Sequence, residues 1–373
     1  MTHKIAIDLT AYTPSRMDGI NRYSFEILKA LLNTNLDFLV YTSHPILPNK
    51  RIKVIANPEM SDNNFQGNIT RLFWHQFQLP QYLKQDKISL LYTPVPEGMF
   101  FPVCPQIITV HDLLPIFFPE VYPRIKYYFQ YILPYLLKSA TAIIAVSQST
   151  KNDLQKYYNI PSDLIHVVYP GYNSDNFNSI LTPEANNIPA KYKLQNFILC
   201  VGETRPYKNT RRLIYAFSQL NFPDLTLAIV GKLSKMDKEL ISLPKELNIV
   251  DKVSFLGEVT DEELAGLYHT AKAFVFPSLY EGFGIPPLEA MACGCPVVTS
   301  RVASLPEVCG DAVYYVNPED INSITEGIYQ VLTDINLAAK LRNQGLERVK
   351  QFDYQITASR IKEIISINSN VNF

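Results

Sequence analysis

The sequence predicts an α/β protein built from two parallel-sheet, Rossmann-like domains. Three observations support this class. Short apolar runs alternate with stretches of helical pattern along most of the chain. At 373 residues the chain is long enough for two domains of ordinary size. Between Gly171 and Asn196 the composition shifts toward Asn, Ser and Pro, which indicates a connection between the domains.

The composition disfavours several classes of protein. Hydrophobic residues make up 47% and charged residues 18% of the chain, which is typical of a folded protein rather than a disordered one. The formal net charge of −1 provides no general attraction to nucleic acid, so we expect no nucleic-acid partner. The five cysteines include no CxxC pair, and we expect reduced core thiols without a metal site.

We expect neither a targeting segment nor a membrane-spanning helix. The N-terminal residues lead into a strand pattern without a basic and then apolar leader. No apolar run approaches the roughly 18 residues that a spanning helix needs. A cytoplasmic location fits both observations.

The first domain begins with a predicted strand over 4–9, a loop over 10–18, Gly19 and a helix over 21–32. The motif G-x-G-x-x-G is missing after this strand, which disfavours a nicotinamide-dependent oxidoreductase. Gly19 would let the backbone lie close to a phosphate or an acceptor, although it also fits an ordinary turn before a helix. Further apolar runs predict parallel strands over 38–41, 53–55, 90–92, 106–110 and 142–146.

A histidine and an aspartate, His111 and Asp112, directly follow the predicted strand 106–110. A single histidine is also common as a packed core residue or a turn residue. Ligands of open parallel sheets bind at the carboxyl ends of the strands, however. This position favours a functional role for His111.

Residues 124–138, RIKYYFQYILPYLLK, predict a helix that is rich in aromatic side chains and contains three basic residues. Such a helix is able to rest on a membrane surface beside a lipid-linked acceptor. It also fits an ordinary amphipathic helix whose tyrosines pack on the sheet, and we favour this second interpretation.

The second domain begins with a predicted strand over 197–201, a loop from Gly202 to Asn209 and a helix over 210–220. The rest of the domain is predicted as strands over 225–230 and 253–256, a loop and helix over 304–310, helices between 321 and 351, and a last helix over 352–367.

Within this domain, residues 273–300 predict a strand, a loop, a helix and a second strand. Gly282 and Gly284 allow close approach of a ligand to the loop, and the helix start offers main-chain N–H groups for a phosphate. Glu281 and Glu289 flank this turn, and carboxylates there suit sugar or ribose hydroxyls rather than phosphate. The alternative is a simple helix entry with acidic residues that favour the helix dipole.

Residues 281–289, EGFGIPPLE, with AMACGCPVV after them, resemble the paired-glutamate motif of the retaining glycosyltransferases of family 4. The resemblance implies the GT-B fold, in which two Rossmann-like domains face a central cleft and a C-terminal helix crosses back to the first domain. For this chain it implies an acceptor-binding domain over 1–172, a linker over 173–196, a donor domain over 197–351 and a crossover helix over 352–373.

The resemblance also implies site residues. The implied catalytic set is His111, Arg205, Lys208 and Glu281, in which Glu281 holds the hydroxyls of the transferred sugar. The implied donor-binding set consists of basic residues, glycines and the second glutamate, which holds the ribose: Gly19, Arg205, Lys208, Gly282, Phe283, Gly284, Ile285 and Glu289. Many relatives have arginine directly before the lysine, where this chain has Tyr207. Arg205 is therefore expected to reach the same phosphate from an altered place.

Transfer from a nucleotide sugar leaves negative charge on the departing diphosphate, which a preorganised positive field stabilises. The sequence contains no Asp-x-Asp pair to hold a metal. We expect Lys208, Arg205 and the main-chain N–H groups of residues 282–285 to supply this field without a metal or another cofactor. Retention of the anomeric configuration is implied by the family alone.

The implied function is transfer of a sugar from a nucleotide-diphosphate donor to a saccharide or lipid-linked saccharide in polysaccharide or lipopolysaccharide biosynthesis, in the cytoplasm or at the inner face of the membrane. A sugar-nucleotide 2-epimerase and a non-catalytic GT-B partner protein are the alternatives. Nothing in the base-binding region separates guanine from uracil nucleotides. The segment WHQFQLP over 74–80 is similar to bacterial mannosyltransferases of O-antigen type, so the expected donor is GDP-mannose.

Overall fold

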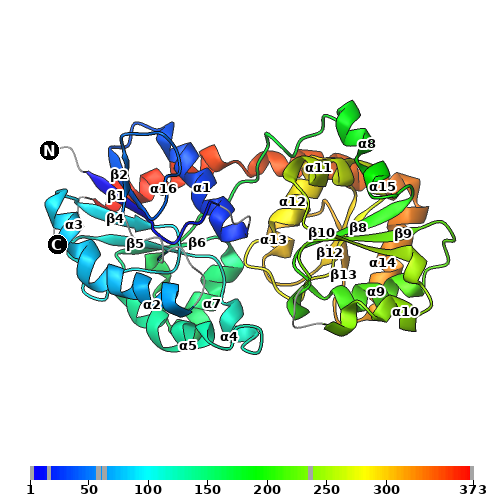
Figure 1. Ribbon diagram of the computed structural model, residues 1–373, viewed down its shortest axis with the longest axis horizontal. Coiled ribbons are helices and arrows are strands. Elements are labelled where there is room, and N and C mark those ends of the chain that lie inside the picture. Colours follow the sequence, from blue (N-terminus) through cyan, green and yellow to red (C-terminus); the bar gives the residue numbers. More distant parts are fainter. Residues whose placement is uncertain (1–3, 15–17, 56–59, 61–64, 234–237, 370–373) are drawn as a thin grey trace. The chain divides into compact units, whose positions relative to one another are not determined.

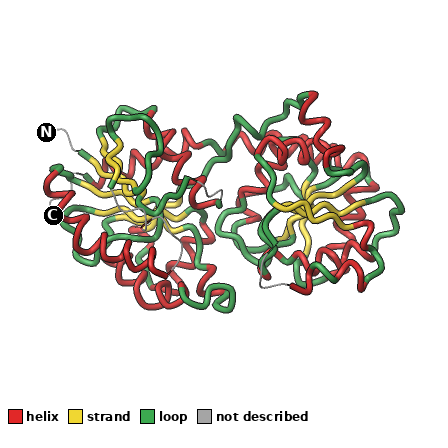
Figure 2. Tube along the Cα trace, viewed as in Figure 1, coloured by secondary structure: helices red, strands yellow, loops and turns green. Residues whose placement is uncertain are grey.

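The computed structural model describes residues 4–14, 18–55, 60, 65–233 and 238–369. The chain forms two compact units, one of Met1–Gly171 with Phe352–Phe373 and one of Tyr172–Gln351. Figure 1 labels the helices and strands, and Figure 2 shows that each unit has a central sheet covered by helices.

A seven-stranded parallel sheet forms the centre of the first unit, in the order β3-β2-β1-β4-β5-β6-β7. Every residue of β1, β4, β5 and β6 is buried, as expected for strands covered by helices on both faces. The strands are β1 (Ile5–Leu9), β2 (Phe38–Thr42), β3 (Ile52–Val54), β4 (Leu90–Thr93), β5 (Gln106–Val110), β6 (Ala142–Ala145) and β7 (Ile165–Val167).

The helices of the first unit include the last helix of the chain, α16, which packs beside α1 (Figure 1). Tyr23 and Ile27 of α1 share one hydrophobic core with Ile361 and Ile365 of α16. The helices are α1 (Gly19–Leu32), α2 (Phe65–Phe73), α3 (Leu79–Gln85), α4 (Leu114–Phe117), α5 (Ile125–Tyr127), α6 (Leu133–Lys138), α7 (Gln148–Tyr158) and α16 (Tyr354–Asn368).

Two π-helical turns interrupt these helices, η2 (Trp74–Gln78) and η3 (Tyr128–Ile132). Each ends directly before a Leu-Pro pair, with Pro80 after the first and Pro134 after the second. Proline has no N–H to donate to the preceding turn, so the helix widens there. The helix predicted over 124–138 is therefore three helical segments, α5, η3 and α6.

A six-stranded parallel sheet forms the centre of the second unit, in the order β10-β9-β8-β11-β12-β13. Strands β8 and β11 are neighbours although two other strands lie between them in sequence, so the carboxyl ends of β8, β11 and β12 adjoin. The strands are β8 (Phe197–Val201), β9 (Thr226–Val230), β10 (Val253–Gly257), β11 (Phe274–Phe276), β12 (Val297–Ser300) and β13 (Tyr314–Val316).

The helices of the second unit include one in the segment that the sequence predicts as a linker. Helix α8 has Thr182 as its N-cap, and it packs so closely on α11 that a Cβ on Gly266 would lie 2.7 Å from the Ala185 carbonyl oxygen. The helices are α8 (Pro183–Lys191), α9 (Thr210–Ser218), α10 (Leu243–Glu246), α11 (Asp261–Thr270), α12 (Ile285–Ala292), α13 (Leu305–Cys309), α14 (Ile321–Thr333) and α15 (Ile335–Arg348).

The predicted α/β class with two parallel sheets is confirmed, and the predicted strands agree with the observed ones to within two residues at each end. Strands β7 and β13 were not predicted. Helix α1 begins at Gly19, two residues before the predicted start, because the Asp18 carboxylate caps its first turn. All five cysteines are buried free thiols.

Candidate active site

The candidate site of the second unit lies on loops at the carboxyl ends of three adjacent strands. Residues 202–209 follow β8, residues 277–284 follow β11, and residues 301–304 follow β12. Because the strands are parallel and adjacent, loops that are distant in sequence come together at one edge of the sheet. This edge holds the basic residues, the glycine turn and both glutamates that the sequence singled out.

Lys208 and Glu281 form the centre of this site. The ammonium Nζ of Lys208 lies 2.7 Å from Oε1 of Glu281, and only 17% and 10% of their side chains are exposed. The same ammonium lies over the rings of Phe276, at 4.9 Å, and Tyr207, at 5.6 Å. Aromatic faces and a carboxylate thus hold one cation in a fixed position.

The glycine turn between β11 and α12 is held by sterics and by one hydroxyl group. Gly284 has φ of 101°, and a Cβ at this position would lie 2.8 Å from Cδ2 of Leu305. The buried Ser304 hydroxyl lies 2.9 Å from the Glu281 carbonyl oxygen and 2.7 Å from the Phe283 carbonyl oxygen, so both accept from its single proton. The turn is therefore anchored on both sides of Gly282.

Two prolines limit the donors at the start of α12. Pro286 and Pro287 occupy the second and third positions of the helix and have no N–H. The main-chain donors near this helix start are consequently those of the turn and of Ile285.

Glu289 lies one turn into α12 and is 5% exposed. Its Oε2 accepts a hydrogen bond of 3.3 Å from the hydroxyl of the buried Tyr268 on α11. Burial, and then the Glu289 charge, raise the pKa of Tyr268 well above its ordinary value. Tyr268 therefore stays protonated and donates to the carboxylate over the whole physiological range.

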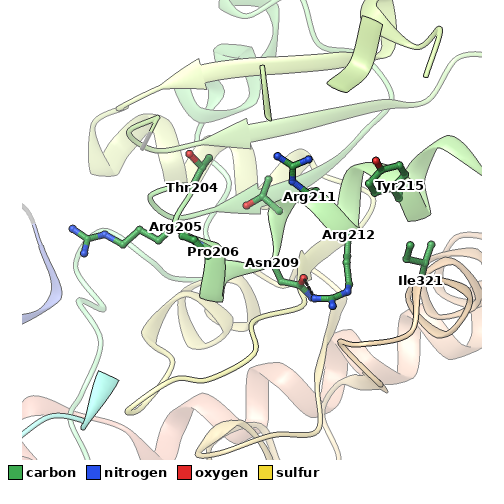
Figure 3. Close-up of a pocket in the computed structure, with 9 residues that line it drawn as sticks. Thr204, Arg205, Pro206, Asn209, Arg211, Arg212, Tyr215 and Ile321 are labelled. Carbon is green, nitrogen blue, oxygen red and sulfur yellow. Dashed lines mark hydrogen bonds between the residues drawn. The ribbon is translucent and has the colours of Figure 1, made fainter. Parts of the chain in front are cut away.

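Arg205 lies in the same loop as Lys208 but has a different side-chain partner. Its Nε donates to Oε2 of Glu203 at 2.7 Å. Figure 3 shows its side chain extended at the rim of a hollow of about 530 Å³. That hollow is lined by Thr204, Arg205, Pro206, Asn209, Thr210, Arg211, Arg212, Tyr215 and Ile321, and neither Lys208 nor Glu281 is part of it. The structure thus pairs Lys208 directly with Glu281, and it pairs the Arg205 guanidinium with Glu203.

His111 lies at the carboxyl end of β5 in the first unit. Its Nε2 is 2.8 Å from the carbonyl oxygen of Pro94, which accepts but does not donate, so Nε2 carries the proton. Burial lowers the pKa of His111 to about 4. The imidazole is therefore neutral, with Nδ1 as its acceptor. Its ring is nearly perpendicular to that of Tyr23, at a centroid distance of 4.8 Å.

Gly19 begins helix α1 directly after its N-cap, Asp18, whose Oδ1 accepts from the main-chain N–H and the side-chain amide of Asn21. A Cβ on Gly19 would have no neighbour within 4 Å among the described residues. Packing among the described residues therefore does not require a glycine at this position.

Two residues that form hydrogen bonds to Glu281 or Glu289 were not predicted from the sequence, which has no motif that marks them. Ser304 is one serine among many, and Tyr268 is one of 23 tyrosines. Their roles depend on tertiary contacts with residues 21 or more positions away.

Among the described residues, no cluster of three or more His, Cys, Asp or Glu side chains has the arrangement of a metal site. None of their helices combines the length and apolar character needed to cross a bilayer.

Sequence models of two domain families match the chain in succession. The model described as Glycosyltransferase Family 4 matches residues 17–176, and the model described as Glycosyl transferases group 1 matches residues 182–348. Between them they include the loops of both sheet edges described above.

Curated relatives include two O-antigen enzymes. O-antigen chain mannosyltransferase B of Escherichia coli is 35% identical over 258 residues, which cover 66% of this chain and 66% of that protein. O-antigen chain mannosyltransferase RfbU of Salmonella typhimurium is 35% identical over 226 residues, which cover 61% of this chain and 60% of that protein. The chain thus matches somewhat less than two thirds of the length of each.

Solved structures show the same fold along nearly the whole chain. Sucrose-phosphate synthase from Thermosynechococcus elongatus superposes with a TM-score of 0.81 at 22% identity over 98% of both chains. WaaG, a glycosyltransferase involved in lipopolysaccharide biosynthesis, gives 0.74 at 20% identity over 97% of this chain and 99% of that one. With both domain models matched in order and the GT-B fold shared, the protein belongs to glycosyltransferase family 4.

Proposed function

We propose that the protein transfers a sugar, with GDP-mannose as donor, to a saccharide or lipid-linked saccharide acceptor in lipopolysaccharide or other polysaccharide assembly. The observation that carries the proposal is the Lys208–Glu281 pair beside the glycine turn, at the sheet edge where open parallel sheets bind ligands. The names of the relatives, which are O-antigen mannosyltransferases, support the sugar and the pathway class.

Lys208 is the proposed electrostatic catalyst. When the glycosidic bond to the diphosphate breaks, negative charge grows on the departing oxygen, and a fixed cation close to it lowers the barrier. The ammonium of Lys208 is already held by Glu281 and two rings, so little reorganisation is needed during the reaction. Main-chain N–H groups of the turn, and Arg205 from the neighbouring position, complete the phosphate site without a metal.

The glutamates and His111 have proposed roles in positioning sugar and ribose. Glu281 accepts from hydroxyls of the transferred sugar, and Glu289, oriented by Tyr268, accepts from the ribose. His111 accepts from a sugar hydroxyl through Nδ1, since Nε2 is committed to Pro94. Retention of the anomeric configuration follows the family and is part of the proposal.

Peripheral membrane contact through residues 124–138 completes the proposal. Tyr127, Tyr131 and Tyr135 recur every fourth residue and are 55%, 58% and 66% exposed. Lys126 and Lys138 lie over the rings of Tyr127 and Tyr135. Exposed aromatic rings beside cations suit the interface of an anionic bilayer. Our preference for tyrosines packed on the sheet was wrong for these three side chains.

Two experiments test the function. A thermal-shift panel of GDP, UDP, ADP and their sugars should show the largest rise in melting temperature with the true donor nucleotide, by mass action. Incubation of GDP-mannose with a lipid-linked saccharide, with and without EDTA, should release GDP equally in both. An epimer formed from the sugar nucleotide without acceptor would identify an epimerase, and the absence of any nucleotide-dependent shift would refute the proposal.

A further inference from the structure

Asn209 directly follows Lys208 and has an unusual set of contacts. It is 4% exposed and adopts a left-handed conformation, with φ of 62° and ψ of 25°. Its Nδ2 donates to the carbonyl oxygens of Pro277, at 2.9 Å, and Pro318, at 2.7 Å. Its Oδ1 accepts from Arg212 at 3.0 Å, and Figure 3 shows the Arg212 side chain directed toward it.

These partners determine the orientation of the amide. Both carbonyl oxygens only accept and the guanidinium only donates, so exchange of Nδ2 and Oδ1 would break all three hydrogen bonds. Among the natural side chains, asparagine combines two N–H donors on a short side chain with tolerance of the left-handed region. Aspartate has no donor at neutral pH, and glycine tolerates the conformation but has no donor.

The contacts join the Lys208 loop to two other strand ends. Pro277 directly follows β11, and Pro318 follows β13 by two residues. A second link, from the N–H of Leu279 to the carbonyl oxygen of Tyr207 at 2.8 Å, connects the same loop to the segment that leads to Glu281. The loop is therefore held on both sides of Lys208.

From this arrangement we infer that Asn209 is a positioning residue that sets the place of the Lys208 ammonium relative to the diphosphate. The inference rests on the proposed function. Lys208 acts as a point charge on a flexible stem, so its effect depends on the placement of its backbone. A displacement of about 1 Å in an active site is able to cost roughly 10²-fold in rate. We expect Asn209 itself to touch neither donor nor acceptor.

The test compares Asn209→Gly with Asn248→Gly. Both asparagines are left-handed residues of the second unit, with φ of 62° and 55°, but Asn248 is exposed. GDP and UDP, and the nucleosides guanosine and uridine, are titrated by calorimetry into the wild type and each variant, alone and combined with Lys208→Met. We expect Asn209→Gly to weaken diphosphate binding roughly 10-fold to 10²-fold, to leave nucleoside binding unchanged, and to add nothing once Lys208 is replaced.

Three outcomes would overturn the inference. The two asparagine variants could bind the diphosphates equally well, Asn209→Gly could cost the same factor with and without Lys208, or nucleoside binding could fall with diphosphate binding. If the wild type binds neither diphosphate, the proposed function itself fails. Should Asn209→Gly not fold, Asn209→Ser, which keeps one donor, is expected to show a smaller loss of the same kind.

A measurement without ligand distinguishes failure of the positioning role of Asn209 from failure of the proposed function. The coupling between Lys208 and Glu281 in urea unfolding, taken from a double-mutant cycle, should fall by at least half in the Asn209→Gly background. An unchanged coupling would refute the positioning role even if the protein is a transferase.

Discussion

The Lys208–Glu281 pair provides the sharpest quantitative prediction. Two unit charges 2.7 Å apart attract by about 6 kcal/mol at an effective dielectric constant of about 20. Desolvation offsets much of this attraction, and removal of one partner from a buried pair typically costs about 3–5 kcal/mol. Because 17% and 10% of the two side chains remain exposed, water screens the pair, and we expect about 2–3 kcal/mol for Lys208→Met.

Methionine keeps most of the apolar stem that packs on Phe276, so Lys208→Met removes mainly charge. Unfolding in urea followed by circular dichroism gives the stability; tryptophan fluorescence would report the other unit, where Trp74 lies. The double variant Lys208→Met/Glu281→Gln should recover most of the lost stability, since it leaves no unpaired carboxylate. Both variants should lose roughly 10²–10³ in turnover.

The matched control is Lys350→Met. Lys350 pairs with Glu347 at the same 2.7 Å, but these side chains are 66% and 72% exposed. An exposed pair contributes about 0–1 kcal/mol, so this variant should unfold almost as the wild type does and keep full turnover. Wild-type stability and turnover in Lys208→Met would refute both the energetic and the catalytic role of the pair.

Three further predictions concern other parts of the chain. Burial opposes a charge on His75, but the hydrogen bond and charge of Asp8, 3.1 Å away, outweigh it and raise the pKa of His75. The stability lost in His75→Gln should therefore be greatest below about pH 6.5 and shrink as the pH rises through the raised pKa, as measured by urea unfolding at several pH values. The pKa of His111 is lowered to about 4 by burial, so its stabilising effect is present above about pH 6.5 and is lost as the pH falls toward 4. The ratio of kcat/KM between wild type and His111→Gln should stay constant from pH 6 to 8, and a step near pH 6.5 would contradict a neutral imidazole. Gly266→Ala places a Cβ 2.7 Å from the Ala185 carbonyl oxygen and should cost about 1–3 kcal/mol, whereas an increase in melting temperature would show that α8 does not pack as described.

The strands of both sheets, including the edge strands β3 and β10, were predicted from local pattern, except for the edge strands β7 and β13. Buried parallel strands such as β5 and β8 are continuous apolar runs, and they were predicted within two residues of their observed bounds. Strands β7 and β13 are three residues long and partly exposed, and neither is a continuous run of buried apolar residues. The π-helical turns before Pro80 and Pro134 also have a local cause, the proline that follows each of them. Hydrophobic periodicity alone did not predict these turns.

The predicted linker shows a second limit of prediction from local sequence. Its polar composition indicated a connection between the domains and led to no helix prediction, and residues 183–191 form a helix with a threonine N-cap. That helix has few buried residues of its own and is stabilised by packing on α11, where Gly266 allows close approach. Local composition does not predict a contact between segments that are about 80 residues apart in sequence.

Residue type and spacing along the chain indicated the two α/β sheets, and the resemblance carried by residues 281–289 indicated the family and named Lys208, Glu281 and Glu289 as candidate site residues. The sequence did not predict which side chains meet across the sheet edge. Only the structure shows that Lys208 pairs with Glu281 and that Arg205 pairs with Glu203. The same is true of the supporting hydrogen bonds made by Ser304, Tyr268 and Asn209. The physical reason is strand order. Parallel pairing places β8 beside β11 and β12, so side chains 70 or more residues apart become neighbours, and their distances and protonation depend on that pairing rather than on the residues next to them in sequence.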